Sequence, residues 1–447
     1  MFGLEKYTTV VMNNEDEETI MVTVKIEKKR TIIDSLFVFC LILDIISSHV
    51  PMGNYIDEMV SLLALVGQIV FLLREKKVSK SEFVFILCIL GMVVLGIVSD
   101  IYWNYFLGIG VIIKDIVGIF KFFICFAFFN RVVKEYDLTR KNDVVLISKF
   151  LILCFFLFGF LSLFVDIGMG DSVRFGLRSY KFMYSFYNVL VFNTLILLAV
   201  LMTSTRANLV YYLMGFSVLI LTLRTKALIV IVLVAVFKLM DKKKELVKKG
   251  IAKKLKFIIP IVIVVIFIVK DKIALYVDFG RYNSIRIGAL FTGIEIAGDC
   301  FPLGSGFGTY GTSLSYMNGS KVYQLYNEIN YNLMMDPRFG FASMSDTYWP
   351  AIYAQLGFFG FLLFIYCLYC CFRYVMRASF SKLQNRQACM VIMIYMLVIS
   401  MTEAVYINET GVTAAIIIAI ILNLSDKGRC LRIESQSLIG LNRKIPR

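Results

Sequence analysis

The sequence predicts an all-α protein that crosses a membrane many times. Of its 447 residues, 59% are hydrophobic and only 18% are charged, far from the composition of a soluble domain. Runs close to the ~20 apolar residues that span a bilayer follow one another along the chain. One such run can be a buried soluble helix, but a whole series cannot. We therefore expect about twelve transmembrane helices, at residues 31–50, 55–73, 82–99, 105–129, 146–167, 183–203, 208–222, 224–240, 256–271, 346–372, 388–405 and 409–424.

The first 30 residues are polar and precede the first apolar run. No small-residue cleavage site follows that run, so we expect an uncleaved first helix rather than a signal peptide. Residues 1–30 are then a cytoplasmic N-terminal segment, and residues 425–447 a basic cytoplasmic tail.

The formal net charge of +15 is distributed in a way that argues against nucleic acid as the partner. With twelve spans and an inner N-terminus, the main basic clusters all face the cytoplasm, as the positive-inside rule requires. This charge orients the chain and meets anionic lipid headgroups. The clusters lie at 25–30, 74–80, 131–149, 242–256, 373–386 and beyond 427.

One polar interruption dominates the predicted outer side. Residues 31–271 hold the first nine predicted helices, 272–345 form a long external loop, and 346–424 hold the last three. A connection of that length is normally functional or has structure of its own. A shorter external loop spans 167–182.

Cations in the predicted outer loops are the first candidate site, because outer loops are usually depleted of them. Arg224 and Lys226 interrupt an apolar stretch, LTLRTKALIVIVL, and arginine in a helix centre costs about 2.5–3.5 kcal/mol on insertion scales. They either mark a turn with snorkelling side chains or face an anion at the membrane edge. Arginine's planar fork suits a diphosphate, including one that gains charge as it leaves. The outer cations are Arg174, Arg178, Lys181, Arg224, Lys226, Arg281 and Arg286.

The glycines of PLGSGFGTYG, at 302–311, do not form a nucleotide loop. No strand precedes them, and the spacing and lysine of a phosphate-binding loop are absent. We expect Gly304, Gly306 and Gly308 to allow a tightly packed backbone beside the membrane.

Candidate general bases are few. Glu403 lies near the outer end of a predicted helix, where carboxylates are functional candidates. Asp346 opens another helix, as a base or as its N-cap, with Trp349 as an interfacial anchor. The single histidine, His49, is expected at the interface. Cysteines lie mostly in apolar runs, and no HExxH, paired CxxC or nucleophile elbow is present, so we predict neither a metal nor another cofactor.

Four segments in the same order around the long loop carry a family resemblance. They read SVRFGLRSYKFMYSFYN, LTLRTKALI, RYNSIRIGALFTGIEIAGDCFPLGSGFGTYG and SDTYWPAIYAQLGFFGFLLF. The chain resembles the O-antigen polymerase (Wzy) and O-antigen ligase group of bacterial membrane glycosyltransferases. The resemblance covers the second half of the chain, while the first four helices add only hydropathy. It implies a fold like that of C-type glycosyltransferases, with an outward-facing active site in the cytoplasmic (inner) membrane.

The resemblance implies a metal-independent repeat-unit polymerase for lipopolysaccharide or exopolysaccharide. Such an enzyme transfers a growing glycan from undecaprenyl diphosphate to another carrier-linked repeat unit. Donor, acceptor and membrane lipids would be its partners, with a chain-length regulator and a flippase as candidate protein partners and no nucleic acid. Glu403 or Asp346 would act as base. The diphosphates would be bound by Arg174, Arg178, Arg224, Lys226, Arg281 and Arg286.

Three alternatives remain open at the level of sequence. A ligase of this group is expected to use a histidine in the large loop, and its absence there favours the polymerase. A lipid-linked oligosaccharide flippase or transporter is disfavoured because the chain shows neither internal repeats nor interrupted helices near mid-membrane. A purely structural subunit of a polysaccharide assembly complex is the third.

Overall fold

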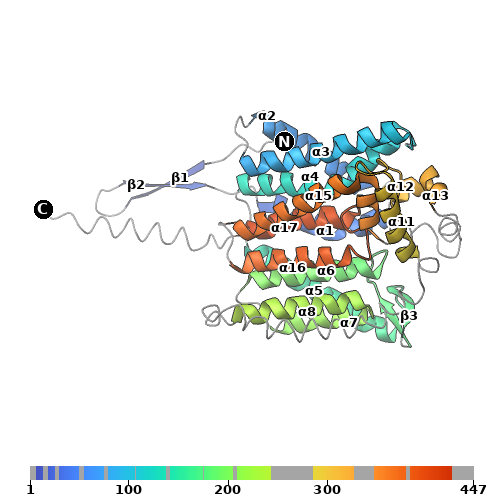
Figure 1. Ribbon diagram of the computed structural model, residues 1–447. Helices are drawn as coiled ribbons and strands as arrows, with labels where there is room; N and C mark the ends of the chain where they lie inside the picture. Colours follow the sequence, from blue (N-terminus) through green and yellow to red (C-terminus); the bar gives the residue numbers. More distant parts are fainter. Residues whose placement is uncertain are drawn as a thin grey trace.

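The protein is a bundle of helices that run side by side (Figure 1). The computed structural model describes residues 7–13, 19–25, 30–49, 55–74, 79–105, 107–136, 141–174, 176–204, 209–242, 285–326, 347–378 and 383–424. Helices account for most of them, and the few strands form two short antiparallel pairs. At one end of the bundle lie β3 and the short helices α11, α12 and α13; we call this the cap end.

Every predicted apolar run within the described residues coincides with a helix. The run at 256–271 lies outside them, and the number of spans stays a prediction. The first eight helices are α1 (Arg30–His49), α2 (Ile56–Arg74), α3 (Lys80–Trp103), α4 (Ile109–Tyr136), α5 (Lys141–Phe164), α6 (Tyr187–Thr203), α7 (Leu209–Leu221) and α8 (Thr225–Lys242). The later ones are α11 (Ile285–Asp299), α12 (Ser313–Met317), α13 (Lys321–Tyr326), α15 (Trp349–Arg377), α16 (Leu383–Ile399) and α17 (Glu409–Leu422).

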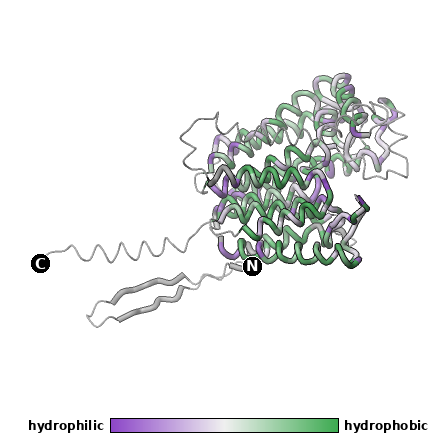
Figure 2. Tube along the Cα trace, turned by 90° about the horizontal axis from the view of Figure 1, so that it is seen from below, coloured by the Kyte–Doolittle hydropathy of each residue, from purple (hydrophilic) through white to green (hydrophobic). Residues whose placement is uncertain are grey.

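Four described helices are long and apolar enough to cross a membrane: Ile56–Arg74, Lys80–Trp103, Asn142–Phe164 and Trp349–Arg377. Their outward faces are apolar; Leu63 and Leu73 of α2 are 68% and 78% exposed. Figure 2 shows hydrophobic residues along the bundle and hydrophilic ones toward its ends. Apolar side chains facing outward as well as inward are typical of helices in lipid. The prediction of a helical, multi-pass membrane protein is confirmed at this level.

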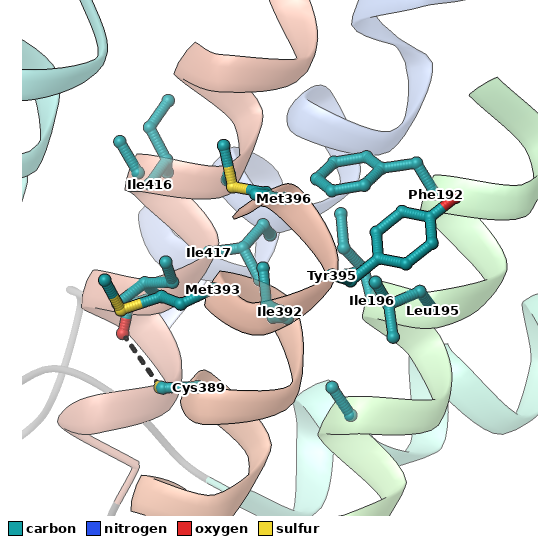
Figure 3. Packing of buried hydrophobic residues seen from close by; sticks show 14 of the residues in the cluster. Phe192, Leu195, Ile196, Cys389, Ile392, Met393, Tyr395, Met396, Ile416 and Ile417 are labelled. Carbon is teal, nitrogen blue, oxygen red and sulfur yellow. Dashed lines mark hydrogen bonds between the residues drawn. The ribbon is translucent and has the colours of Figure 1, made fainter. Parts of the chain in front are cut away.

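The centre of the bundle is built by α6, α16 and α17. These helices are shorter than the four spans, but α6 is buried on all sides from Leu190 to Thr203. The rings of Phe192 and Tyr395 stack with centroids 6.5 Å apart, joining α6 to α16 (Figure 3). Helix α17 packs on α4, α1 and α16, and therefore links the two halves of the bundle.

The two strand pairs were not predicted. Strands β1 (Tyr7–Asn13) and β2 (Thr19–Lys25) form a hairpin within the predicted N-terminal segment. Strands β3 (Gly170–Arg174) and β4 (Leu177–Tyr180) form another within the predicted 167–182 loop. YTTVVMN and TIMVTVK are rich in β-branched residues, which favour strands. The strands are short, so the alternation of polar and apolar residues along them does not stand out from ordinary loop sequence.

The predicted loop 272–345 is described from 285 to 326, and its remaining residues lie outside the described part of the chain. Helix α11 packs on α15. A small second core joins the loop to α15, formed by Ile296, Cys300, Tyr310, Tyr316, Val322, Tyr323 and Ala354.

Candidate functional site

The two cations that interrupt the apolar stretch lie at a tight turn. Leu223, in the left-handed region with φ 54°, separates α7 from α8, so Arg224 precedes α8 and Lys226 lies in its first turn. Both side chains are partly buried and contact other segments. One of the two interpretations of Arg224 and Lys226 was a tight turn, and the structure contains that turn. Both cations also have specific partners.

Arg224 is held between a strand and a helix. Its guanidinium carbon lies 3.3 Å from the centroid of the Tyr187 ring, and its Nη2 donates a hydrogen bond of 2.9 Å to Ser172 Oγ. Ser172 belongs to β3 and Tyr187 begins α6. A cation over an aromatic face is stabilised by the ring's quadrupole, which holds the planar guanidinium in one orientation.

Lys226 forms an ion pair with Glu403. Asn188 Nδ2 donates to Glu403 as well, and both donors bond to the same carboxylate oxygen, Oε1. The side chains of Lys226 and Glu403 remain 22% and 21% exposed, so the pair is accessible from solution. We call Ser172, Tyr187, Asn188, Arg224, Lys226 and Glu403 the cation site.

Two helix N-termini converge on the cation site. Tyr187 and Asn188 are the first two residues of α6, and Arg224 and Lys226 flank the first residue of α8. The N-terminus of a helix presents free N–H groups and a partial positive charge, which favours anions. With Arg224 and Lys226 added, the site is suited to an anionic group, and Glu403 contributes the opposing charge.

The hairpin arginines are more exposed. Arg174 ends β3, and Arg178, on β4, forms an ion pair with Asp166. The hydrogen bond from Arg178 is the main reason that the pKa of Asp166 lies below its ordinary value. A separate hydrogen bond, from Arg224 to Ser172 of β3, joins the hairpin to the cation site.

Among the remaining predicted arginines and carboxylates, only Arg286 lies within the described residues. Arg281 and Asp346 lie outside the described residues. Arg286 is in the first turn of α11, which packs on α15 rather than beside α6 or α8.

The predicted glycine positions lie in a second constellation at the cap end. Gly304, Gly306 and Gly308 have φ of 82°, 96° and 70°, and residues 304–312 are buried throughout. We call residues 302–311 the glycine segment. The Ser305 and Gly306 N–H groups donate to the carbonyls of Ala354 (2.8 Å) and Gln355 (3.0 Å).

Those carbonyls are available because α15 is interrupted. Gly357 has φ 65° and ψ −168°, outside the helical region. A side chain at Gly357 would collide with Leu303 and Gly304. The glycine segment and the break in α15 are therefore two halves of one contact.

Two buried carboxylates bind the other side of the glycine segment. Phe307 N–H donates to Asp100 (3.1 Å) and Gly308 N–H to Asp115 (2.9 Å). These aspartates, on α3 and α4, are 1% and 2% exposed. A Cβ on Gly306 would collide with the Asp100 carboxylate. The segment is anchored through its backbone, and the N–H groups of residues 303–308 and of Gly311 are already occupied.

One turn connects the glycine segment's surroundings to the cation site. Trp349 Nε1 donates to Ser400 Oγ (3.1 Å), and the Tyr348 ring lies 5.3 Å from that of Tyr406. Glu403 lies between Ser400 and Tyr406 in the connection from α16 to α17. The start of α15 therefore packs on the turn that carries Glu403.

Sequence reasoning missed six important partners, among them Ser172, which meets Arg224 across 52 positions of the chain. Tyr187 and Asn188 belong to the quoted segment SVRFGLRSYKFMYSFYN, but they lie at its far end, where an aromatic and an amide are ordinary interfacial residues. Asp100 directly follows the predicted run 82–99, and Asp115 lies inside the run 105–129. An ionisable residue inside a membrane run is a functional candidate, so Asp115 carried a usable signal. Gln355 donates to Tyr310 O over 2.5 Å and had no distinguishing sequence signal.

No group of three or more His, Cys, Asp or Glu side chains within the described residues could hold a metal ion. The chain matches no protein-family model, and no curated protein matches it. The resemblance to the O-antigen polymerase and ligase group therefore rests on the sequence segments alone.

Proposed function

We propose that the protein is a repeat-unit polymerase that acts on diphosphate-linked glycans at the membrane surface. The observation that carries the proposal is the cation site: Arg224 oriented on Tyr187 beside a carboxylate, Glu403, that Lys226 and Asn188 fix. Anion recognition and a candidate base then lie next to each other at the end of an apolar bundle.

The proposal includes a topology. The chain crosses the bacterial cytoplasmic membrane about twelve times, with both termini cytoplasmic and the cap end outside. Basic clusters at 74–80, 242–256 and 373–386 would then face the cytoplasm, in line with the positive-inside rule. The substrate is undecaprenyl diphosphate bearing the glycan, whose lipid tail stays in the membrane while its diphosphate reaches the surface.

In the proposed reaction, the acceptor hydroxyl oxygen bonds to the anomeric carbon of the donor glycan. The bond between that carbon and the diphosphate oxygen breaks, and its electron pair leaves with undecaprenyl diphosphate. The hydroxyl proton passes to Glu403. Arg224 and the N-termini of α6 and α8 stabilise the charge that grows on the leaving diphosphate, where a preoriented donor is most effective.

In this proposal Lys226 has a different role from the diphosphate binding that its charge alone suggested. Because it bonds to Glu403, Lys226 positions the base and neutralises it between substrates. Arg174 and Arg178 lie on the hairpin at the edge of the site and would act earlier, as charges that steer the approaching diphosphate.

The test is the length distribution of surface glycan in cells that carry Arg224→Ala. We expect a normally inserted protein and glycans of a single repeat unit. Arg224→Lys should rescue poorly, since an ammonium cannot reproduce the bidentate fork. Arg377→Ala, at the far end of α15, is the matched control and should leave the ladder unchanged.

A full-length ladder from Arg224→Ala at normal protein level would overturn the proposal. Polymer that accumulates on its carrier without transfer to a lipid core would indicate a ligase instead. Transport of labelled lipid-linked glycan across vesicles without lengthening would indicate a flippase.

A further inference from the structure

Helix α11 has three distinct faces. One packs on α15, where Gly293 lies against Pro350 and Tyr353, and Tyr353 Oη donates to Leu290 O over 2.8 Å. An acidic edge carries Glu295 and Asp299, both exposed. The third edge is apolar and exposed, and it has no function in the proposed reaction.

The apolar edge is continuous. Phe291 and Ile294 are 51% and 58% exposed, and Phe301, two residues past the end of α11, is 61% exposed. With Gly298 they follow positions i, i+3, i+7 and i+10, which is one face of a helix. The Cys300 N–H bonds to Ile296 O over 2.9 Å, so helical geometry continues to Phe301.

This edge joins the lipid-facing surface of a membrane span. The Phe301 ring centroid lies 6.4 Å from that of Phe358 and 6.3 Å from that of Phe359. Those two residues are 51% and 49% exposed and belong to α15, a helix long and apolar enough to cross a membrane. Leu362 continues the same surface, 48% exposed.

The glycine segment fixes the depth of α11. It follows α11 directly and contacts Ser99 and Asp100, which lie inside the span Lys80–Trp103. Irregular backbone at membrane depth is tolerated only where protein covers it, and residues 304–312 are buried throughout. A helix satisfies its own backbone, so α11 is suited to contact acyl chains directly.

We propose that α11 and Phe301 are embedded in the membrane leaflet at the cap end, with their apolar edge against phospholipid acyl chains. The acidic edge then faces the headgroups and water, and residues 302–312 form a re-entrant segment between α3, α4 and α15. Part of the chain that its polarity placed outside the membrane is therefore a membrane element. This inference does not depend on the reaction that the protein catalyses.

Photo-crosslinking of the purified full-length chain in phospholipid vesicles tests the proposal. Benzoyl-phenylalanine is placed singly at Phe291 and Phe301, and covalent transfer of tritiated phospholipid is measured after illumination. Phe359 is the lipid-facing reference, and Met317 of α12, 64% exposed, represents an apolar residue of the cap. Asp299, exposed on the acidic edge and farther around α11 from Phe291, Ile294 and Phe301 than Glu295, is the matched control.

We expect adducts at Phe291 and Phe301 within about twofold of Phe359 and at least about fivefold above Met317 and Asp299, as the lipid-facing side of an interfacial helix would give. Labelling of both sites at the Met317 level would overturn the proposal. So would a crosslinked dimer in place of lipid adducts, which would make this edge an interface between two copies. A variant that migrates as an aggregate is replaced by Ile294 on the same edge.

Discussion

The glycine segment and the cation site use carboxylates in opposite ways. Asp100 and Asp115 are 1% and 2% exposed and accept backbone N–H groups. Glu403 accepts from two side chains, Lys226 and Asn188, and remains 21% exposed. In the first region water is excluded and the carboxylates bind backbone N–H groups. In the second, the charged side chains are partly exposed and can exchange partners with a ligand.

The difference explains which region is suited to structure and which to chemistry. Buried backbone groups must be hydrogen-bonded, so the aspartates complete the fold where α15 is interrupted. A partly exposed ion pair contributes little to stability, so selection for stability does not account for the arrangement of Arg224, Lys226 and Glu403. We therefore expect variants of the cation site to lose activity and variants of the glycine segment to lose stability.

The largest effect is expected at Glu403. Glu403→Gln keeps an acceptor for Lys226 and Asn188 but removes the basic carboxylate, so the proposed proton transfer loses on the order of 10²–10⁴ in rate. In vesicles with labelled lipid-linked glycan, elongation should fall by that factor while the thermal midpoint of the detergent-solubilised protein changes little. Asp100→Asn is the opposite control, because it should lower the thermal midpoint while the folded protein keeps its elongation activity. Equal loss of stability in both variants would remove the distinction between the regions.

The next effect is expected at Gly306. An alanine there meets two obstacles, φ of 96° and the Asp100 carboxylate, and left-handed backbone at a non-glycine residue alone costs about 1–3 kcal/mol. Gly319→Ala isolates that backbone cost, since Gly319 has φ 65° and no atom within 4 Å of an added Cβ. Thermal unfolding should show a clearly larger loss for Gly306→Ala. Equal midpoints would mean that Asp100 moves aside without cost.

A smaller effect is expected for Asp100→Ala. The Phe307 N–H would lose its acceptor, and a buried donor left unsatisfied costs about 1–3 kcal/mol. Asp100→Asn retains a carbonyl acceptor and should recover part of that loss. Thermal midpoints of the two variants measure the difference. If Asn is no better than Ala, the hydrogen bond to Phe307 is not what Asp100 contributes.

The smallest effect is expected at the hairpin. Arg178 lowers the pKa of exposed Asp166, so the folded-state pKa lies below the unfolded value. Any stabilisation is present above the ordinary value of 3.8 and is lost as pH falls through the folded pKa. Thermal midpoints of Arg178→Ala and the parent chain should therefore differ slightly at about pH 7 and converge once the pH falls below the folded-state pKa of Asp166, where its carboxyl is protonated in the folded and the unfolded chain. A difference that grows on acidification would contradict the ion pair.

Several parts of both regions were predictable from sequence, each through a local signal. Arg224 and Lys226 stood out because they interrupt an apolar run, and Glu403 because it is acidic near a predicted helix end. Asn188 and Ser172 did not, since their partners are far away in the chain: Asn188 meets Glu403 across 215 positions, and Ser172 meets Arg224 across 52. Contacts of that kind have no local pattern.

The sequence by itself determined that this is a helical membrane protein, since apolar runs of spanning length leave few other stable structures in lipid. It also indicated that the glycines near 302–311 serve backbone packing rather than nucleotide binding. Only the tertiary structure decided that Lys226 bonds to Glu403, that α15 is interrupted to receive the glycine segment, and that α11 presents an apolar edge beside Phe358 and Phe359. Hydropathy depends on neighbouring residues, whereas these pairings depend on how distant helices pack.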